Sequence, residues 1–202
     1  MSVFKDILVA SQIEEATITQ LQKWLPTYLR EIERQLEIRV GSTPIPEHYS
    51  NRNSLDMLAG EKFPKIIVIA PGLDGTPLAD GGGVYEARWQ LGVGSIIAAN
   101  SEPLANMQSK IYGAACRKIM IDKQSLGGIA RAISWTDEQY EDLPVPNQNM
   151  LLKSAVVYFS VDCQNVSTKW SGPENPDEDP YAYGIVERVI IDIEKLPIEV
   201  EA

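Results

Sequence analysis

The spacing of apolar residues predicts a long amphipathic helix near the start of the chain, over residues 12–37. Apolar side chains recur there every three or four residues, which places them on one helical face. That face comprises Leu21, Leu25, Leu29, Ile32 and Leu36. Ser11 followed by Glu14 matches a capping box at the helix start. Pro26 lacks a backbone donor, so we expect a kink or break near residues 23–25.

A second helix is predicted over residues 101–123, because Ser101, Glu102 and Pro103 form a typical helix start. Its apolar face comprises Leu104, Met107, Ile111, Ala115 and Ile119. Three basic residues near its end suit the negative end of the helix dipole. They are Arg117, Lys118 and Lys123.

Five segments have the pattern of β-strands, either a run of β-branched residues or an alternation of apolar and polar residues. They span residues 64–70, 85–93, 129–135, 154–163 and 183–193. Residues 40–63 lack a clean periodicity and are predicted to be irregular, with a short helical turn at 54–58.

The order of these elements predicts an α+β fold. We expect a mainly antiparallel sheet of about five strands, with the two main helices packed on one face. The prediction is a single domain over residues 1–202, with a long hairpin loop at 72–83 and an acidic loop at 172–180. A third long loop, polar in composition, is predicted at 136–149.

The charge of the chain limits its partners. The 202 residues include 18 basic and 28 acidic ones, for a formal net charge of -10. This balance argues against nucleic acid or an anionic membrane surface as a bound partner, because both attract Lys and Arg. The N-terminal sequence does not have the pattern of a signal peptide, and the apolar runs are too short to span a membrane. We expect a chain made and kept in a reducing cytoplasm, with Cys116 and Cys163 as buried free thiols.

Candidate catalytic and metal-binding motifs fail on their context. His48, the only histidine, has no serine-nucleophile motif elsewhere in the chain and is predicted to be an ordinary surface residue. The glycines at 81–83 precede a strand pattern, which favours a flexible hairpin tip over a phosphate loop. An EF-hand loop starting at Asp177 would need glycine and glutamate where Ala182 and Arg188 stand. We therefore expect no catalytic, cofactor-binding or metal-binding residues, and a protein that is not an enzyme.

The overall layout resembles the tail terminator proteins of long, non-contractile-tailed (siphovirus-type) phages, especially those that infect actinobacteria. The similarity covers about residues 12–193, and four stretches within that range carry it. They are the helix with its Trp-Leu-Pro-Thr-Tyr-Leu core at 24–29, the Phe-Pro-Lys-Ile-Ile-Val-Ile-Ala-Pro-Gly run at 63–72, the strand pattern at 85–93 and the strand pattern at 155–162.

The resemblance implies a structural virion protein at the head-proximal end of the tail, assembled in the host cytoplasm. Such proteins form a homo-oligomeric ring, typically a hexamer, that ends polymerisation of the tail tube and joins the tail to the head connector. Its partners are further copies of itself, the tail tube protein and the head–tail connector proteins. DNA passes through the ring without specific binding. The alternatives are a small-molecule-binding or enzymatic α/β domain that uses the loop at 72–83, and another connector or minor tail component.

The three long loops, at 72–83, 136–149 and 172–180, are the expected binding surfaces, and the alternative is that they are ordinary solvated loops. The loop predicted at 136–149 is the expected contact between subunits. Trp135 and Tyr140 are typical interface anchors. The acidic residues beside them are Asp137, Glu138, Glu141 and Asp142. We expect these carboxylates to set the register against basic groups of a neighbouring subunit, such as Arg88 or Arg131.

Overall fold

A computed structural model describes residues 8–51, 62–79, 84–143 and 151–168. All of them belong to one unit of the chain, Met1–Thr168. The single-domain prediction for residues 1–202 is not tested, and the predicted strand at 183–193 and acidic loop at 172–180 lie outside the described residues. The elements are α1 (Ala10–Gln35), β1 (His48–Ser50), β2 (Lys65–Leu73), β3 (Leu78–Ala79), β4 (Val84–Ala99), α2 (Glu102–Asp122), the short 3-10 helix η2 (Leu126–Gly128), β5 (Ala130–Leu143) and β6 (Leu151–Thr168).

The predicted α+β class and mainly antiparallel sheet are confirmed. The strands lie in the order β1-β2-β4-β6-β5, and β3 pairs with β4. Within the described ranges, β1 and β2 are the one parallel pair of strands. The sheet has six described strands rather than the predicted five or so, because β1 and β3 form in segments predicted to be irregular or loop.

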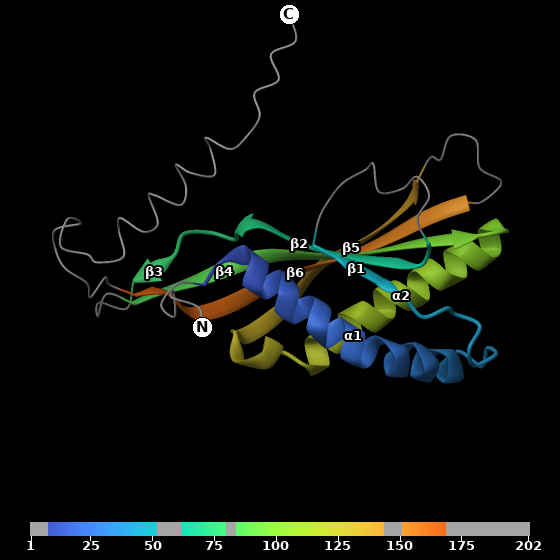
Figure 1. Ribbon diagram of the computed structural model, residues 1–202, viewed down its shortest axis with the longest axis horizontal. Helices are drawn as coiled ribbons and strands as arrows, with labels where there is room; N and C mark the ends of the chain where they lie inside the picture. The colour runs from blue at the N-terminus through green and yellow to red at the C-terminus, as the bar shows by residue number, and fades with distance from the viewer. Residues whose placement is uncertain (1–7, 52–61, 80–83, 144–150, 169–202) are drawn as a thin grey trace, which may run out of the picture. The chain divides into compact units, whose positions relative to one another are not determined.

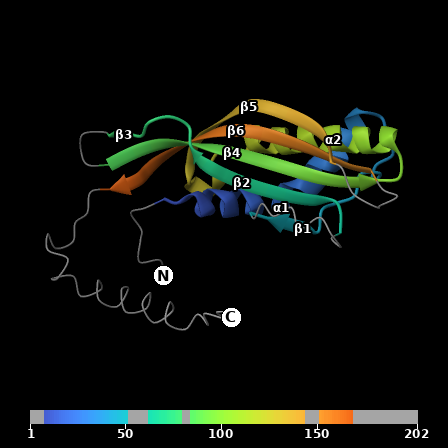
Figure 2. The ribbon, with the colours of Figure 1, turned by 90° about the horizontal axis from the view of Figure 1, so that it is seen from above.

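Both helices lie against the same face of the sheet (Figures 1 and 2), as predicted. The core between the layers is built by alternate residues of the long central strands, of which Leu91, Val93, Val157, Phe159 and Val161 are almost fully buried. Leu21, Leu25 and Leu29 of α1 and Ile111, Ala115 and Ile119 of α2 pack against them. The opposite face of the sheet carries no helix of the described chain (Figure 2).

The ends of the predicted helical stripes are less buried than expected. Leu36 is 55% exposed, because α1 ends at Gln35 and Leu36 is its C-cap. Leu104 is 37% exposed in the first turn of α2. The stripe predictions therefore hold in the middle of each helix and are wrong at these two ends.

Two predictions about α1 are corrected. The helix is continuous from Ala10 to Gln35, with Pro26 inside it, so a break near residues 23–25 is wrong, while the alternative of a kink there stays a prediction. The predicted capping box of Ser11 and Glu14 is also wrong. The N-cap is Val9, whose backbone N–H donates to Gln12 Oε1 at 2.9 Å. Glu14 Oε1 instead accepts the Ala70 N–H at 2.8 Å, which joins α1 to β2.

A buried carboxylate fixes the turn after α1. The Glu33 side chain has no exposed surface. It accepts the backbone N–H groups of Gly41 at 2.7 Å and Thr43 at 2.6 Å, and Arg30 pairs with it at 2.9 Å. Burial would raise the pKa of Glu33, but these hydrogen bonds to the charged form outweigh it and lower the pKa to about 2. We call this arrangement the Glu33 clasp.

The strands are longer than the sequence indicates. β4 has 16 residues and β6 has 18, and the two pair along almost their whole length. β5 has 14 residues and continues to Leu143, so the loop predicted at 136–149 is wrong for residues 136–143. Similarly, β2 extends to Leu73 and β3 lies within the hairpin loop predicted at 72–83, although β2 and β4 are antiparallel as that hairpin requires.

Candidate functional site

The predicted contact residues lie on an edge strand rather than on a loop. Among the described strands, β5 is the last one in the sheet order and pairs only with β6. Trp135 is 48% exposed and Tyr140 is 43% exposed. Glu138 is the carboxylate between them, and the Tyr140 hydroxyl donates to it.

Arg117 of α2 holds this edge cluster together. Its guanidinium forms an ion pair with Glu138, and its Cζ atom lies 4.7 Å from the centre of the Trp135 ring. Burial and the hydrogen bond to Glu138 raise the pKa of Tyr140 well above its ordinary value. Two exposed aromatic rings are thus held in fixed positions by one cation and one carboxylate, which reduces the entropy that a partner would have to remove on binding. We call Arg117, Trp135, Glu138 and Tyr140 the edge cluster.

The backbone of β5 is protected against pairing with another strand near this cluster. The register with β6 shifts between Trp135 and Asp137, which is a β-bulge. Asp137 Oδ1 accepts the Glu138 N–H at 2.8 Å, and Trp135 Nε1 donates to the Asp137 carbonyl at 3.0 Å. Bulges and charged residues are features that blunt sheet edges. A partner at this part of the edge would therefore meet side chains rather than free backbone groups.

The two arginines predicted to meet these carboxylates in a neighbouring subunit already have partners within the chain. Arg88 Nε donates to Asp162 Oδ1 at 2.6 Å. Arg131 forms an ion pair with Glu86, with 3.8 Å between Arg131 Nη1 and Glu86 Oε2. Contact of Arg88 or Arg131 with a neighbour stays a prediction, and it would require these internal pairs to be exchanged.

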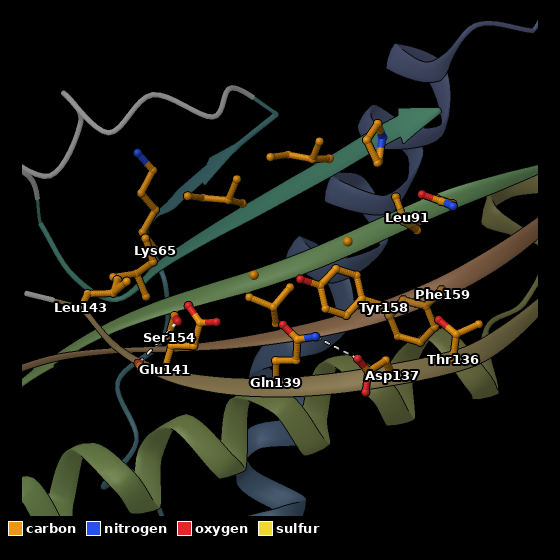
Figure 3. A pocket seen from close by; sticks show the side chains of 18 of the residues that line it. Lys65, Leu91, Thr136, Asp137, Gln139, Glu141, Leu143, Ser154, Tyr158 and Phe159 are labelled. Atoms are coloured by element: carbon orange, nitrogen blue, oxygen red, sulfur yellow. Dashed lines mark hydrogen bonds between the residues drawn. The ribbon is translucent and has the colours of Figure 1, made fainter. Parts of the chain in front are cut away.

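The face of the sheet opposite the two helices is hollowed. Figure 3 shows the hollow, which crosses β2, β4, β6 and β5 and has a volume of about 740 Å³. Its floor is apolar and includes the half-buried side chains of Ile67, Ile69 and Val156. Gly92 and Gly94 of β4 also line it, and the absence of their side chains deepens the floor. We call this concavity the sheet hollow.

Polar groups surround that floor. Asp137, Gln139 and Glu141 follow one another at alternate positions of β5 and lie along one side (Figure 3). Gln139 Nε2 donates to Asp137 Oδ2 at 2.9 Å. Asp74 lies at the side formed by the end of β2 and accepts the Ser160 hydroxyl at 2.7 Å. Three carboxylates and one lysine, the buried Lys65, therefore line the sheet hollow, which gives it a negative balance.

The remaining sequence candidates fall outside both surfaces. His48 is exposed at the start of β1, as predicted for a surface residue. Cys116 and Cys163 are buried free thiols, also as predicted. Burial raises the pKa of Cys116 to about 12 and that of Cys163 to about 11, so neither is a thiolate at neutral pH. The glycines at 81–83 and the acidic residues at 177–179 lie outside the described residues.

Comparison with known proteins identifies no family. No family model matches the chain, and no curated protein matches it. Within the described ranges, no group of three or more His, Cys, Asp or Glu side chains is placed to hold a metal ion. None of the described helices combines the length and apolar character needed to cross a bilayer.

Sequence reasoning found the edge cluster residues Trp135, Glu138 and Tyr140 but missed Arg117, whose contact with them depends on how α2 packs. It also missed the sheet hollow. The sequence signal that could have indicated the hollow is the pair of glycines at 92 and 94, at the end of the strand pattern predicted over 85–93, because glycine in a strand often marks a close approach to the sheet. Ile67 and Ile69 lie in a strand predicted to be buried, and the structure shows both half-buried.

Proposed function

We propose that the protein is a tail terminator of a siphovirus-type phage. It is a structural virion protein that forms a homo-oligomeric ring, a hexamer, at the head-proximal end of the tail tube. The ring ends tube polymerisation and joins the tail to the head connector. DNA passes through it without specific binding, in keeping with the net charge of -10.

The observation that carries the proposal is the edge cluster. Trp135 and Tyr140 are exposed, and the half-buried Arg117 holds them in fixed positions. Trp, Tyr and Arg are the residue types that dominate binding energy at protein interfaces. They lie on one edge of the sheet, while β1 forms the other edge. Contacts between different surfaces of identical subunits generate rings when the rotation closes. A protein with such an anchor at one edge is suited to this kind of assembly.

The experiment compares the assembly of the wild-type protein with that of the variant Trp135→Ala. Light scattering and negative-stain electron microscopy, with and without purified tail tubes, report ring formation and capping. We expect rings from the wild-type protein and weakened rings or capping from the variant, with an unchanged circular dichroism spectrum. Tyr85→Ala is the matched control, because Tyr85 is an aromatic residue with a similar exposed fraction, 43% against 48% for Trp135, and lies outside the edge cluster. A wild-type protein that stays monomeric with tubes present contradicts the proposal.

The runner-up is a small-molecule-binding domain, and the sheet hollow favours it. Its volume of about 740 Å³ lies within the range of ligand pockets. Asp74, which follows β2 in the loop predicted at 72–83, contributes to it. A monomer with a ligand-dependent rise in melting temperature would favour this function. The third alternative, another connector or minor tail component, would bind head connectors without capping tubes.

A further inference from the structure

The outer surface of the helical layer carries a basic and aromatic patch. Lys23 Nζ lies 5.3 Å from the centre of the Trp24 ring, and Lys123 Nζ lies 4.4 Å from it. Lys23 is exposed, and Trp24 and Lys123 are half-buried. Two ammonium groups thus share one indole ring and join α1 to the end of α2.

The patch continues along α2. The Trp24 ring packs edge-on against Tyr28, with ring centres 6.5 Å apart. The Tyr28 hydroxyl donates to Asp122 Oδ2 at 2.9 Å, and Lys118 Nζ donates to Asp122 Oδ1 at 2.7 Å. Ile121, which is 40% exposed, lines the adjoining groove between the helices. We call Lys23, Trp24, Lys118, Ile121 and Lys123 the basic helix surface. Even with Asp122 counted, the charge balance of this surface is positive.

The basic helix surface and the sheet hollow have opposite net charges, and both also present apolar side chains. The hollow has a floor of half-buried aliphatic side chains and a side of carboxylates that includes Asp137 and Glu141. The helix surface offers an aromatic ring and Ile121 among lysines. The two surfaces belong to opposite sides of the two-layer unit, since the helices cover one face of the sheet and the hollow lies on the other (Figures 2 and 3). A single copy cannot bring them together.

We propose that the basic helix surface of one copy docks into the sheet hollow of the next copy. This inference rests on the proposed function, because it names a contact through which the ring forms. The contact gives each sheet a helical layer on both faces, an arrangement that covers apolar sheet surface in many α/β proteins. It joins different surfaces of identical subunits, so it can repeat from copy to copy and close into a ring. The complementary charges of the basic helix surface and the sheet hollow fix how one copy is oriented against the next.

Charge reversal at each surface tests the contact. The hollow variant carries Gln139→Lys and Glu141→Lys, at two exposed positions that line the hollow. The helix variant carries Lys23→Glu and Lys118→Glu. We expect each variant alone to be folded by circular dichroism and monomeric by light scattering, because like charges then face each other across the contact. A control variant with Glu15→Lys and Glu102→Lys changes exposed glutamates outside both surfaces and should assemble normally.

Mixing the two variants supplies the decisive result. In a 1:1 mixture, the reversed hollow meets the reversed helix surface, and the two unreversed surfaces meet each other. We therefore expect assembly to return to at least half of the wild-type level, with the two variants alternating. Native mass spectrometry of variants that differ in mass reads this alternation directly.

The other outcomes overturn the contact in distinguishable ways. If both variants form normal rings, the contact is wrong and the ring proposal stands. If the hollow variant forms rings but no longer caps tail tubes, the tube protein occupies the hollow and docking of a second copy is wrong. If mixing restores nothing although both variants are folded, the two surfaces do not meet. A wild-type protein that is monomeric with and without tubes overturns the proposed function and this contact together.

Discussion

Replacement of Glu33 by glutamine is the sharpest test of how the turn after α1 is held. The carboxylate is fully buried and accepts N–H groups from Gly41 and Thr43 as well as the ion pair from Arg30. Glutamine has nearly the same shape. However, it loses the charge that Arg30 requires. The Gly41 and Thr43 N–H groups bind different carboxylate oxygens, and glutamine replaces one of these oxygens with an NH2 group, which cannot accept. Buried donors left without partners are costly.

The lowered pKa of Glu33 gives the size of the free energy that its charged form contributes to folding. Lowering it from an ordinary value of 4.5 to about 2 corresponds to about 3 kcal/mol of folding free energy at pH 7. Because the folded pKa lies below the unfolded one, this contribution is complete above about pH 4.5 and is lost as the pH falls towards 2. We expect Glu33→Gln to lower the free energy of unfolding by roughly 2–3 kcal/mol at pH 7. The difference in the free energy of unfolding between the wild-type and variant proteins should shrink when the pH falls to 3.

Urea unfolding at pH 7 and pH 3, followed by circular dichroism, measures that difference. Glu31→Gln is the matched control, because Glu31 lies on the same helix and also pairs with an arginine, but its side chain is 53% exposed. We expect a much smaller loss for the control at either pH, since exposed ion pairs contribute little. A Glu33→Gln penalty that is equal at the two pH values would show that the charge of the carboxylate is not what fixes the turn.

Three further predictions concern the core, the edge cluster and DNA. Leu29 is fully buried, so Leu29→Ala should cost about 2–5 kcal/mol in urea unfolding. A side chain at Gly113 would place its Cβ 2.8 Å from the Tyr140 hydroxyl and from Glu138 Oε1. Gly113→Ala should therefore displace the edge cluster, seen as a change in Trp135 fluorescence. Duplex DNA should not bind at physiological salt, and submicromolar, salt-sensitive binding in a gel-shift assay would contradict the charge argument.

The helical layer and the sheet could be predicted from the sequence because each of their main elements has one buried side and one exposed side. Leu21, Leu25 and Leu29 repeat with the helical period, and β6 alternates cleanly from Ala155 to Cys163, because one side of each element is buried. The Glu33 clasp could not be predicted in this way. A glutamate on a helix is normally exposed, and only the path of the chain at residues 41–43 shows that this one is enclosed.

The sequence predicts a loop beyond Trp135, where β5 in fact continues, because both faces of this part of the strand are polar. One face turns Asp137, Gln139 and Glu141 to the sheet hollow, and the other turns Glu138 and Tyr140 to α2. An edge strand with a hydrogen-bonded polar cluster on one side and an open concavity on the other has no apolar alternation to detect. Its pairing with β6, whose own pattern is strong, decides its structure.

The proposed contact surfaces also have mixed patterns of polar and apolar residues. A residue that will be covered only by another copy must remain soluble in the free subunit, so its pattern is mixed rather than cleanly apolar. Ile67 and Ile69 are half-buried beside carboxylates, and Trp24 is half-buried between two lysines. The net charge of -10 conceals a basic helix surface and an acidic sheet face on opposite sides of one unit. Such a separation of charge gives identical subunits a preferred orientation before they touch, which ring assembly from a single chain requires.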